Sequence, residues 1–349
     1  MYRHVDSSEV TADVSAKIAN LVSTASVVYA FSMSGVGGNP AGVVVNEPST
    51  SITLTVQKAV ASLLNFPETA FVERKSATDC TSSDREGNIE RCAIRWFTPN
   101  GSEVDLCGHA TMAAAHEILR NDSSKTLIFE TRFAGEVIVR SSEEGYRMEF
   151  PEVHLEYNAQ ICRESRASFN CYFTKELASP CPLELLGRTS LGDLVAFGDT
   201  QEDIENLIVS EVRAALLTLE SAGEPRKAFS AIRGLIVVVK TPRYGSTYDF
   251  ASRFFAPHIG IDEDPCTGSA HCFLGPYMSR ILGKVRVAGR QLGPGGGGLV
   301  ICEPLEAGRV ALYGECRRKP SKLPSSREQI PSVECTAPAD AQHGRSGMT

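Results

Sequence analysis

The chain has 349 residues, 42% hydrophobic and 22% charged, the composition of a globular protein large enough for two or three domains. Its net charge of −7 and its sequence pI of about 5.6 leave no basic footprint for holding nucleic acid. No apolar run reaches the length that spans a bilayer. Neither nucleic acid nor a membrane is therefore an expected partner.

The beginning of the chain and its cysteines indicate the compartment. The first residues include early acidic side chains and no apolar signal-peptide core, which predicts a cytoplasmic protein. The eleven cysteines are irregularly spaced and form no Cys-x-x-Cys pair. Reduced thiols are therefore expected, and neither a zinc ribbon nor a thioredoxin-type site is indicated.

Residues 1–24 are polar and acidic, and they are interpreted as an N-terminal extension. The first lobe is predicted over residues 25–151, where residues 53–64 have a clear helical period. Residues 74–91 form a polar insertion that is predicted to be an exposed hairpin tip. Strands are predicted at residues 27–31, 39–45, 68–72, 93–97, 127–131, 136–140 and 146–150.

The second lobe is predicted over residues 152–316, with helical stretches in residues 202–219 and a buried strand at residues 234–239. The glycine-rich residues 293–298 lead into an apolar strand, whereas the dinucleotide-binding fingerprint needs a helix there. Residues 317–349 are rich in Pro and Ser, which predicts a disordered tail. Further strands are predicted at residues 193–197, 249–255, 299–302 and 309–314, the last two as a closing hairpin.

One stretch of sequence occurs twice, and the fold is predicted to be organised around it. Arg-Trp-Phe-Thr-Pro at residues 95–99 leads through an acidic loop into Gly108 and His109. Arg-Phe-Phe-Ala-Pro at residues 253–257 leads in the same way into Gly268 and Ser269. Small and apolar residues follow each turn, at helical spacing in the first case. The repeat predicts two similar halves, each with a strand, a tight turn and a helix.

Two such turns have a chemical meaning if they face one cavity. The first turn of a helix has backbone N–H groups without intrahelical partners, and the helix dipole adds partial positive charge there. Glycine lets a ligand approach the backbone closely, and Ser, His or Asp side chains nearby can complete the site. Two facing helix ends would therefore hold a small anion, most simply a carboxylate, without a cationic side chain.

The motifs resemble those of the PhzF-like family of phenazine biosynthesis and occur in the order of that family over residues 27–316. The resemblance implies an α+β fold like that of diaminopimelate epimerase, with two pseudo-symmetric lobes and the active site between them. Each lobe would be a curved, mostly antiparallel sheet around a central helix. It also implies an isomerase without metal or cofactor, often a homodimer. The motifs are Gly38–Ala41, Glu68–Val72, Arg95–Pro99, Leu106–Thr111 and Ser252–His271.

Carried over residue by residue, the resemblance gives Glu68 as the acid/base that moves a proton. A carboxyl group can do so near neutral pH when an apolar pocket raises its pKa, and Phe66, Pro67 and Phe71 are apolar neighbours in the sequence. The predicted reaction is the isomerisation of a small carboxylate-bearing metabolite in a biosynthetic, secondary-metabolic process. The catalytic candidates are Glu68, Asp264 and His109, and the substrate-binding candidates are Gly108, Gly268, Ser269 and Asn39.

Two alternatives stay open at this point. Related racemases of this fold use a facing pair of cysteines, and Cys107 stands at the first of these positions. The second position is matched to Pro265, with Cys266 one residue later. The other alternative is a protein that binds carboxylates without turnover. A metal site is not predicted, because the cysteines and histidines lack the spacing of structural zinc sites.

The sequence also departs from the family pattern. Leu63 stands where the family often has an acid, and Pro67 stands where it has a serine. A Gly-Arg pair expected near Gly295 is absent, because glycines follow instead. These departures concern substrate selection and the closure of the second half, and they leave the two turns intact.

Overall fold

A computed structural model describes residues 12–48, 51–76, 88–156, 169, 183–221, 232–240 and 244–319. Residues 1–319 form one compact unit. Most of the predicted hairpin tip at residues 74–91 and nearly all of the predicted tail from residue 317 fall outside these ranges. None of the helices in the described ranges is long and apolar enough to cross a membrane.

The described elements are mixed α and β, as the sequence predicts. The helices are α1 (Ala12–Thr24), α2 (Leu54–Leu64), α4 (Gly108–Leu119), α6 (Gln201–Glu205), α7 (Val209–Ser221) and α8 (Gly268–Leu282), with 3₁₀ turns η2 (Pro257–Ile259), η3 (Pro294–Gly296) and η4 (Glu306–Gly308). The strands are β1 (Ser26–Ser32), β2 (Asn39–Asn46), β3 (Glu68–Arg74), β4 (Ile89–Phe97), β5 (Glu103–Val104), β6 (Thr126–Thr131), β7 (Glu136–Ser142), β8 (Gly145–Pro151), β9 (Leu155–Glu156), β10 (Glu184–Thr189), β11 (Asp193–Phe197), β12 (Gly234–Val239), β13 (Phe250–Phe255), β14 (Val287–Gln291), β15 (Gly298–Leu305) and β16 (Arg309–Arg318).

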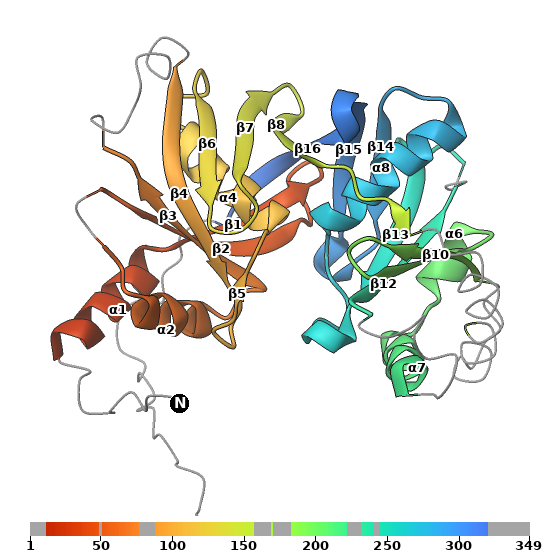
Figure 1. The fold of residues 1–349 in the computed structure, drawn as a ribbon, viewed down its shortest axis with the longest axis horizontal. Helices are drawn as coiled ribbons and strands as arrows, with labels where there is room; N and C mark the ends of the chain where they lie inside the picture. The colour runs from red at the N-terminus through yellow and green to blue at the C-terminus, as the bar shows by residue number, and fades with distance from the viewer. Residues whose placement is uncertain are drawn as a thin grey trace, which may run out of the picture. The chain divides into compact units, whose positions relative to one another are not determined.

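The first group of strands closes on itself around α4. The order of pairing is β1-β2-β3-β4-β6-β7-β8-β16, and β16 also pairs with β1. Helix α4 contacts β1, β2, β3, β7, β8 and β16, so it lies within this ring of strands (Figure 1). Its side chains are correspondingly buried on nearly every face, with Met112, Ala113, Ala114 and Ala115 all inaccessible to solvent.

The second group of strands continues from the same β16. The order runs β16-β15-β14-β13-β12-β11-β10-β9, and α8 contacts β14, β15 and β16 (Figure 1). Strand β16 runs to Arg318, beyond Gly314, where the apolar pattern ends in the sequence. The extra residues pair with β1, and the guanidinium of Arg317 lies 3.7 Å from the ring centroid of Tyr29. Pairing with β1, which lies far away in the sequence, thus extends β16 beyond the apolar pattern that predicts it.

The same order of elements occurs twice along the chain. In the first group β2 and β3 are parallel across α2, and β4 and β6 are parallel across α4. In the second group β11 and β12 are parallel across α6 and α7, and β13 and β14 are parallel across α8. A parallel pair needs such a crossover, and an antiparallel pair does not. Strands β3 and β12 therefore correspond, as do helices α4 and α8.

The predicted N-terminal extension contains a helix that joins the fold. Helix α1 packs on α2, and its Leu21 belongs to a small apolar cluster with Val56, Val60 and Phe71. Residues 12–24 of the predicted extension thus form a 13-residue helix. Its polar residues hide this role in the sequence, because only a narrow apolar stripe faces α2.

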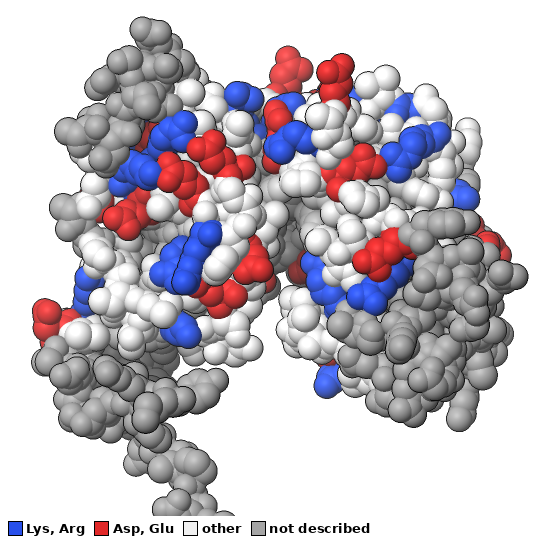
Figure 2. Space-filling view, in the orientation of Figure 1, with Lys and Arg blue, Asp and Glu red and all other residues white. Residues whose placement is uncertain are grey.

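The surface carries charges of both signs close together. On the face seen in Figure 2, Lys and Arg side chains lie among Asp and Glu side chains. Many of them pair directly; for example, Arg91 Nη1 lies 2.8 Å from Glu136 Oε1, and Arg286 Nη2 lies 2.8 Å from Glu144 Oε1. Exposed pairs of this kind contribute little to stability, about 0–1 kcal/mol each.

A substitution at Gly275 tests how closely α8 approaches the sheet. A Cβ added at Gly275 would lie 2.4 Å from the Cβ of Cys302 on β15. We expect Gly275→Ala to lower the free energy of unfolding by about 1–3 kcal/mol, because overpacking outweighs the gain in helix propensity. Chemical denaturation measures the loss. Gly187→Ala is the matched control, because its nearest neighbour would be Leu155 Cδ2 at 3.6 Å; equal losses in the two variants would contradict the close approach.

Candidate active site

The two glycine turns lie side by side. Gly108 is the first residue of α4, and Gly268 is the first residue of α8. A Cβ built on Gly108 would lie 3.8 Å from the Cα of Gly268, and one built on Gly268 would lie 3.7 Å from the Cα of Gly108. Neither N-cap residue, Cys107 or Thr267, caps its helix with its own side chain. Two positive helix ends therefore meet at one place.

Glu68 begins β3 and is buried beside this meeting point. Its residue is 9% exposed, and its Oε2 lies 3.3 Å from His109 Nε2. Burial, and to a smaller extent the charge of Asp264, raise the pKa of Glu68 to about 8, although a hydrogen bond with the Cys107 thiol opposes the shift. A carboxyl group with this pKa can hold a proton and release it near neutral pH.

His109 is a neutral imidazole in this setting. It is 6% exposed, and burial lowers its pKa to about 3. Nδ1 lies 3.5 Å from the Cys107 sulfur. The contact between Nε2 and Glu68 is not aligned as a hydrogen bond, so Nε2 is a buried polar atom without a hydrogen-bond partner in the described structure. Such an atom is costly unless a ligand or a proton shift satisfies it.

Asp264 comes from the other half of the chain, and two side chains hold its carboxyl group. Asn39 Nδ2 donates to Asp264 Oδ1 at 2.8 Å and also to the Cys266 carbonyl at 2.9 Å. The Thr267 hydroxyl donates to the second carboxyl oxygen, Oδ2. Burial raises the pKa of Asp264 to about 6, although the bonds from Thr267 and Asn39 oppose the shift. Asn39 thus ties β2 of the first group to the loop before α8.

Gln291 completes this loop, and the sequence analysis does not name it. Its Nε2 donates to the Asp264 carbonyl at 2.7 Å, and its Oε1 accepts from the Thr267 backbone N–H at 2.9 Å. Gln291 is fully buried at the end of β14. Its only signal in the sequence is a polar residue at the end of a short segment that also contains Arg290. Such a residue is more often exposed, so the pattern gives no reason to select it.

The thiols do not form the pair that a two-cysteine racemase uses. Within this chain, Thr267 stands before Gly268 at the start of α8 as Cys107 stands before Gly108 at the start of α4. Cys266 is fully buried, and a Cβ added to Gly298 on β15 would lie 2.6 Å from its sulfur. The second half therefore places a hydroxyl at the matching position, and Cys107 has no facing thiol there.

Donor atoms for a metal ion come together in one group of described residues. Atoms of Glu68, Cys107 and His109 lie within 4.8 Å of one another. Burial and the charge of Glu68 raise the pKa of the Cys107 thiol well above its ordinary value. A divalent ion would therefore have to displace protons from both the thiol and the Glu68 carboxyl group. The chemistry of this group favours holding protons over holding a metal.

The repeated arginines explain why the two motifs look alike. In the first half, Arg95 Nε and Nη2 each donate at 2.7 Å to the two oxygens of Glu103. In the second half, Arg253 Nε and Nη2 donate at 2.6 and 2.9 Å to the two oxygens of Glu263. Each glutamate stands five residues before the glycine that starts the helix. The paired arginine therefore fixes the loop that leads into each turn.

Both arginine pairs are also anchored on an aromatic ring and on a helix. Arg95 lies 5.1 Å from the ring centroid of Phe97 and donates to Gln57 of α2 at 3.1 Å. Arg253 lies 4.7 Å from the ring centroid of Phe255 and donates to the Leu207 carbonyl, between α6 and α7, at 2.7 Å. The spacing Arg-x-Phe puts both side chains on one face of a strand. The motif thus joins strand, loop and helix in each half.

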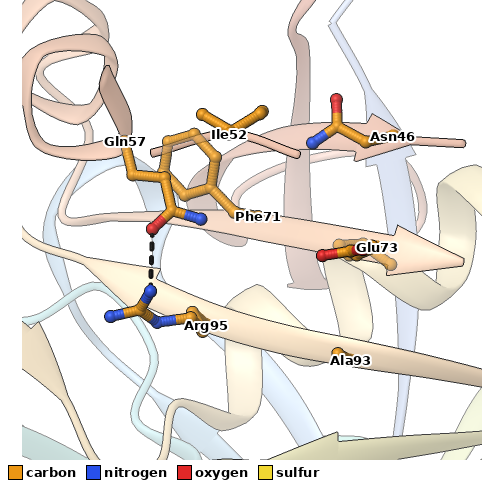
Figure 3. Close-up of a pocket in the computed structure, with 8 residues that line it drawn as sticks. Asn46, Ile52, Gln57, Phe71, Glu73, Ala93 and Arg95 are labelled. Atoms are coloured by element: carbon orange, nitrogen blue, oxygen red, sulfur yellow. Dashed lines mark hydrogen bonds between the residues drawn. The ribbon is translucent and has the colours of Figure 1, made fainter. Parts of the chain in front are cut away.

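A small surface pocket lies beside the first arginine pair (Figure 3). Gln57 and Arg95 meet at one side of it, and Phe71 and Ile52 provide its apolar wall. Glu68, Gly108 and Gly268 do not line it. Phe71 and Glu73, which line the pocket, point to the opposite face of β3 from Glu68, because successive side chains of a strand point to opposite faces. This pocket is therefore separate from the candidate active site.

The comparison with known proteins places the chain. A family model for phenazine biosynthesis-like proteins, PhzC-PhzF, matches residues 28–294. The chain belongs to the PhzC-PhzF family of phenazine biosynthesis-like proteins. The resemblance seen in the motifs is thus confirmed over most of the chain.

Individual relatives extend this finding. The phenazine biosynthesis-like domain-containing protein 2 of Mus musculus is 35% identical over 296 residues, which cover 82% of this chain and 94% of that protein. An uncharacterized isomerase of Pseudomonas aeruginosa is 34% identical over 294 residues, with coverage of 82% and 92%. The crystal structure of a PhzC/PhzF protein from Clostridium difficile is 31% identical with a TM-score of 0.61, and the match covers 84% of this chain and 96% of that one.

Removing each arginine pair in turn tests the positions of the two turns. The side chains of Arg253 and Glu263 are 7% and 10% exposed, whereas those of Arg95 and Glu103 are 29% and 15% exposed. We expect Arg253→Gln to cost about 3–5 kcal/mol of unfolding free energy and Arg95→Gln about 1 kcal/mol. Each variant should also speed amide hydrogen exchange at the start of α8 or of α4, respectively.

Asp262→Asn is the matched control for these variants. Asp262 stands one residue before Glu263 and makes an exposed ion pair with Arg213, which this substitution removes. The control should leave both stability and exchange unchanged. If exchange rises equally in both turns whichever arginine is replaced, the local role of the pairs is wrong.

The pKa of Glu68 makes stability depend on pH. Burial raises this pKa from 4.5 to about 8. Between these values the folded protein keeps a proton that the unfolded chain releases, so stability falls as pH rises through this window. Relative to Glu68→Gln, the wild type should lose up to about 1.4 kcal/mol for each pH unit. Denaturation midpoints measured from pH 4.5 to 8 test this; a constant difference would contradict a buried, protonated Glu68.

Proposed function

We propose that the protein is a cofactor-independent isomerase that moves a proton within a small carboxylate-bearing metabolite. One observation carries the proposal: a buried glutamate with a pKa near 8 lies beside two meeting helix N-termini. Each half of the chain would be one lobe of a fold like that of diaminopimelate epimerase, with the active site between the lobes. The isomerase and PhzC/PhzF names of the relatives support this class of reaction.

The chemistry follows from the two parts of the site. In its carboxylate form, Glu68 removes a proton from a carbon atom near the substrate carboxylate. The negative charge that develops spreads into the carboxylate, which the first-turn N–H groups of Gly108, His109, Gly268 and Ser269 stabilise. Glu68 then returns the proton to a different carbon. No atom is lost and no electron is exchanged with another molecule, so the product is an isomer.

The other acid keeps the site in its working state. The charge on Asp264 raises the pKa of Glu68, so the two carboxyl groups favour sharing one negative charge. His109 stays neutral and bridges Cys107 and Glu68 by contact. It would pass a proton only by taking one at one ring nitrogen while it releases one from the other, so that the ring stays neutral. These roles, like a cytoplasmic homodimer, are part of the proposal.

The two-thiol racemase is the weaker candidate. Thr267, a hydroxyl residue, precedes Gly268 as Cys107 precedes Gly108, and burial raises the pKa of the Cys107 thiol. We therefore expect Cys107→Ser to keep a large part of any activity, whereas a two-thiol enzyme would lose it. A protein that binds carboxylates without turnover would show ligand-dependent stability but no isotope uptake.

Isotope exchange tests the proposal directly. The wild type is incubated in D₂O with a panel of cyclic and amino carboxylic acids, and mass spectrometry measures deuterium at carbon. A substrate found in this way should exchange roughly a hundredfold more slowly with Glu68→Gln, because the acid/base is gone. The wild-type rate should rise with pH and level off above about 8, where Glu68 is ionised.

Glu73→Gln is the control for this experiment. Glu73 lies on the same strand, β3, but is exposed. It should exchange substrate at the wild-type rate. Full activity of Glu68→Gln with a folded protein would refute the role of Glu68, and ligand binding by the wild type without exchange would show a silent binding protein.

A further inference from the structure

The second half of the chain brings a buried acid and an arginine to the start of α8. Arg233 precedes β12, and its Nε donates at 2.8 Å to Oδ1 of Asp193 on β11, while Nη2 pairs with Oδ2. The guanidinium lies 5.5 Å from the ring centroid of Phe254. Nη2 also donates at 3.0 Å to the hydroxyl oxygen of Ser269, the second residue of α8. Arg233 is thus fixed against the turn.

The bond between Arg233 and Ser269 determines what the serine can do. A guanidinium has donors only, so the Ser269 oxygen must be the acceptor. The hydroxyl hydrogen of Ser269 is then directed away from Arg233 and is available to another acceptor. Ser269 is only partly buried, and so it can meet a ligand. This arrangement makes Ser269 a donor suited to an anion.

Arg233 itself keeps donors available. Its side chain is 28% exposed, whereas that of Asp193 is 1% exposed. Within the described part of the chain, Nη1 makes no hydrogen bond. The positive charge of Arg233 also lowers the pKa of Asp264, so the two groups interact electrostatically. A planar guanidinium of this kind matches a carboxylate better than a point charge does.

The correspondence between the halves places Arg233 next to the position that matches Glu68. Thr69 pairs with Phe97 in the first half, and Leu235 pairs with Phe255 in the second, so Glu68 corresponds to Gly234. A Cβ at Gly234 would lie 2.7 Å from the Phe255 carbonyl oxygen, which leaves no room for a carboxylate side chain. One half therefore provides the proton-moving acid, and the other provides a cation one residue earlier.

We propose that Arg233 and Ser269 form the anion subsite of the active site and hold the carboxylate of the substrate. The proposal rests on the isomerase function proposed above and makes it more specific. The substrate would lie with its carboxylate toward α8 and with its reacting carbon toward Glu68. Its class is that of carboxylic acids that have a transferable hydrogen near the carboxylate, and neutral or amide analogues are excluded.

The test uses three probes with one ring and different head groups: benzoate, benzamide and phenyl phosphate. Isothermal calorimetry measures their affinity for the whole chain. The wild type should prefer benzoate to the other two. Arg233→Gln and Ser269→Ala should each weaken benzoate binding roughly tenfold and leave benzamide unaffected. Both substitutions act on one subsite. The variant that carries Arg233→Gln and Ser269→Ala together should therefore lose much less affinity for benzoate than the product of the two single losses.

Two further variants distinguish loss of the anion subsite from loss of folding. Arg233→Gln leaves Asp193 buried without its partner, so Arg233→Gln with Asp193→Asn removes both charges and should show the same loss of benzoate. Arg213→Gln removes an exposed arginine and should bind benzoate as the wild type does. Unchanged benzoate affinity in the folded double variant would refute the subsite, and so would a preference for benzamide or phenyl phosphate.

Glu68→Gln separates this proposal from the proposed function. It should keep benzoate affinity, because the carboxylate is held by the other half of the site. Benzoate binding that survives in Glu68→Gln and falls in Arg233→Gln supports the subsite whether or not isotope exchange depends on Glu68. Benzoate binding that depends on Glu68 but not on Arg233 would overturn the subsite and leave proton transfer as it was proposed.

Discussion

The structure depends on bringing two helix N-termini together with only glycine between them. Gly108 and Gly268 approach so closely that a side chain at either position would enter the space between the turns. Two partly positive ends repel each other unless negative charge lies nearby. Glu68 and Asp264 are buried carboxyl groups at this place, and burial raises the pKa of Glu68 to about 8 and that of Asp264 to about 6. Near neutral pH Asp264 is therefore mostly ionised and Glu68 mostly keeps its proton, so one negative charge lies beside the two helix ends.

Much of this could be predicted from the sequence, because the turns are marked by glycines and by a repeated arginine motif. Glu68, His109, Asp264 and Asn39 do lie together, although their roles are still proposals. Arg233 could not be predicted, because its partners stand 40 and 36 residues away and it belongs to no motif.

The fold shows the same division between local and distant signals. Strands with alternating or continuous apolar residues, such as β7 and β12, agree with the sequence analysis. Strand β10 was missed, because its register shifts between Leu185 and Gly187 and breaks the alternation. The length of β16 depends on β1 and β8, which lie far away in the sequence, and no local pattern contains that information.

The position of β16 has a consequence for how the chain folds during its translation. The ring around α4 closes only when β16 pairs with both β1 and β8, yet nearly the whole second half is translated before β16. The N-terminal ring must therefore stay open on the ribosome while the C-terminal strands emerge, and β1 and β8 expose unpaired edges during that time. This chain therefore gains its native topology late, when β16, the last strand in the described ranges, arrives.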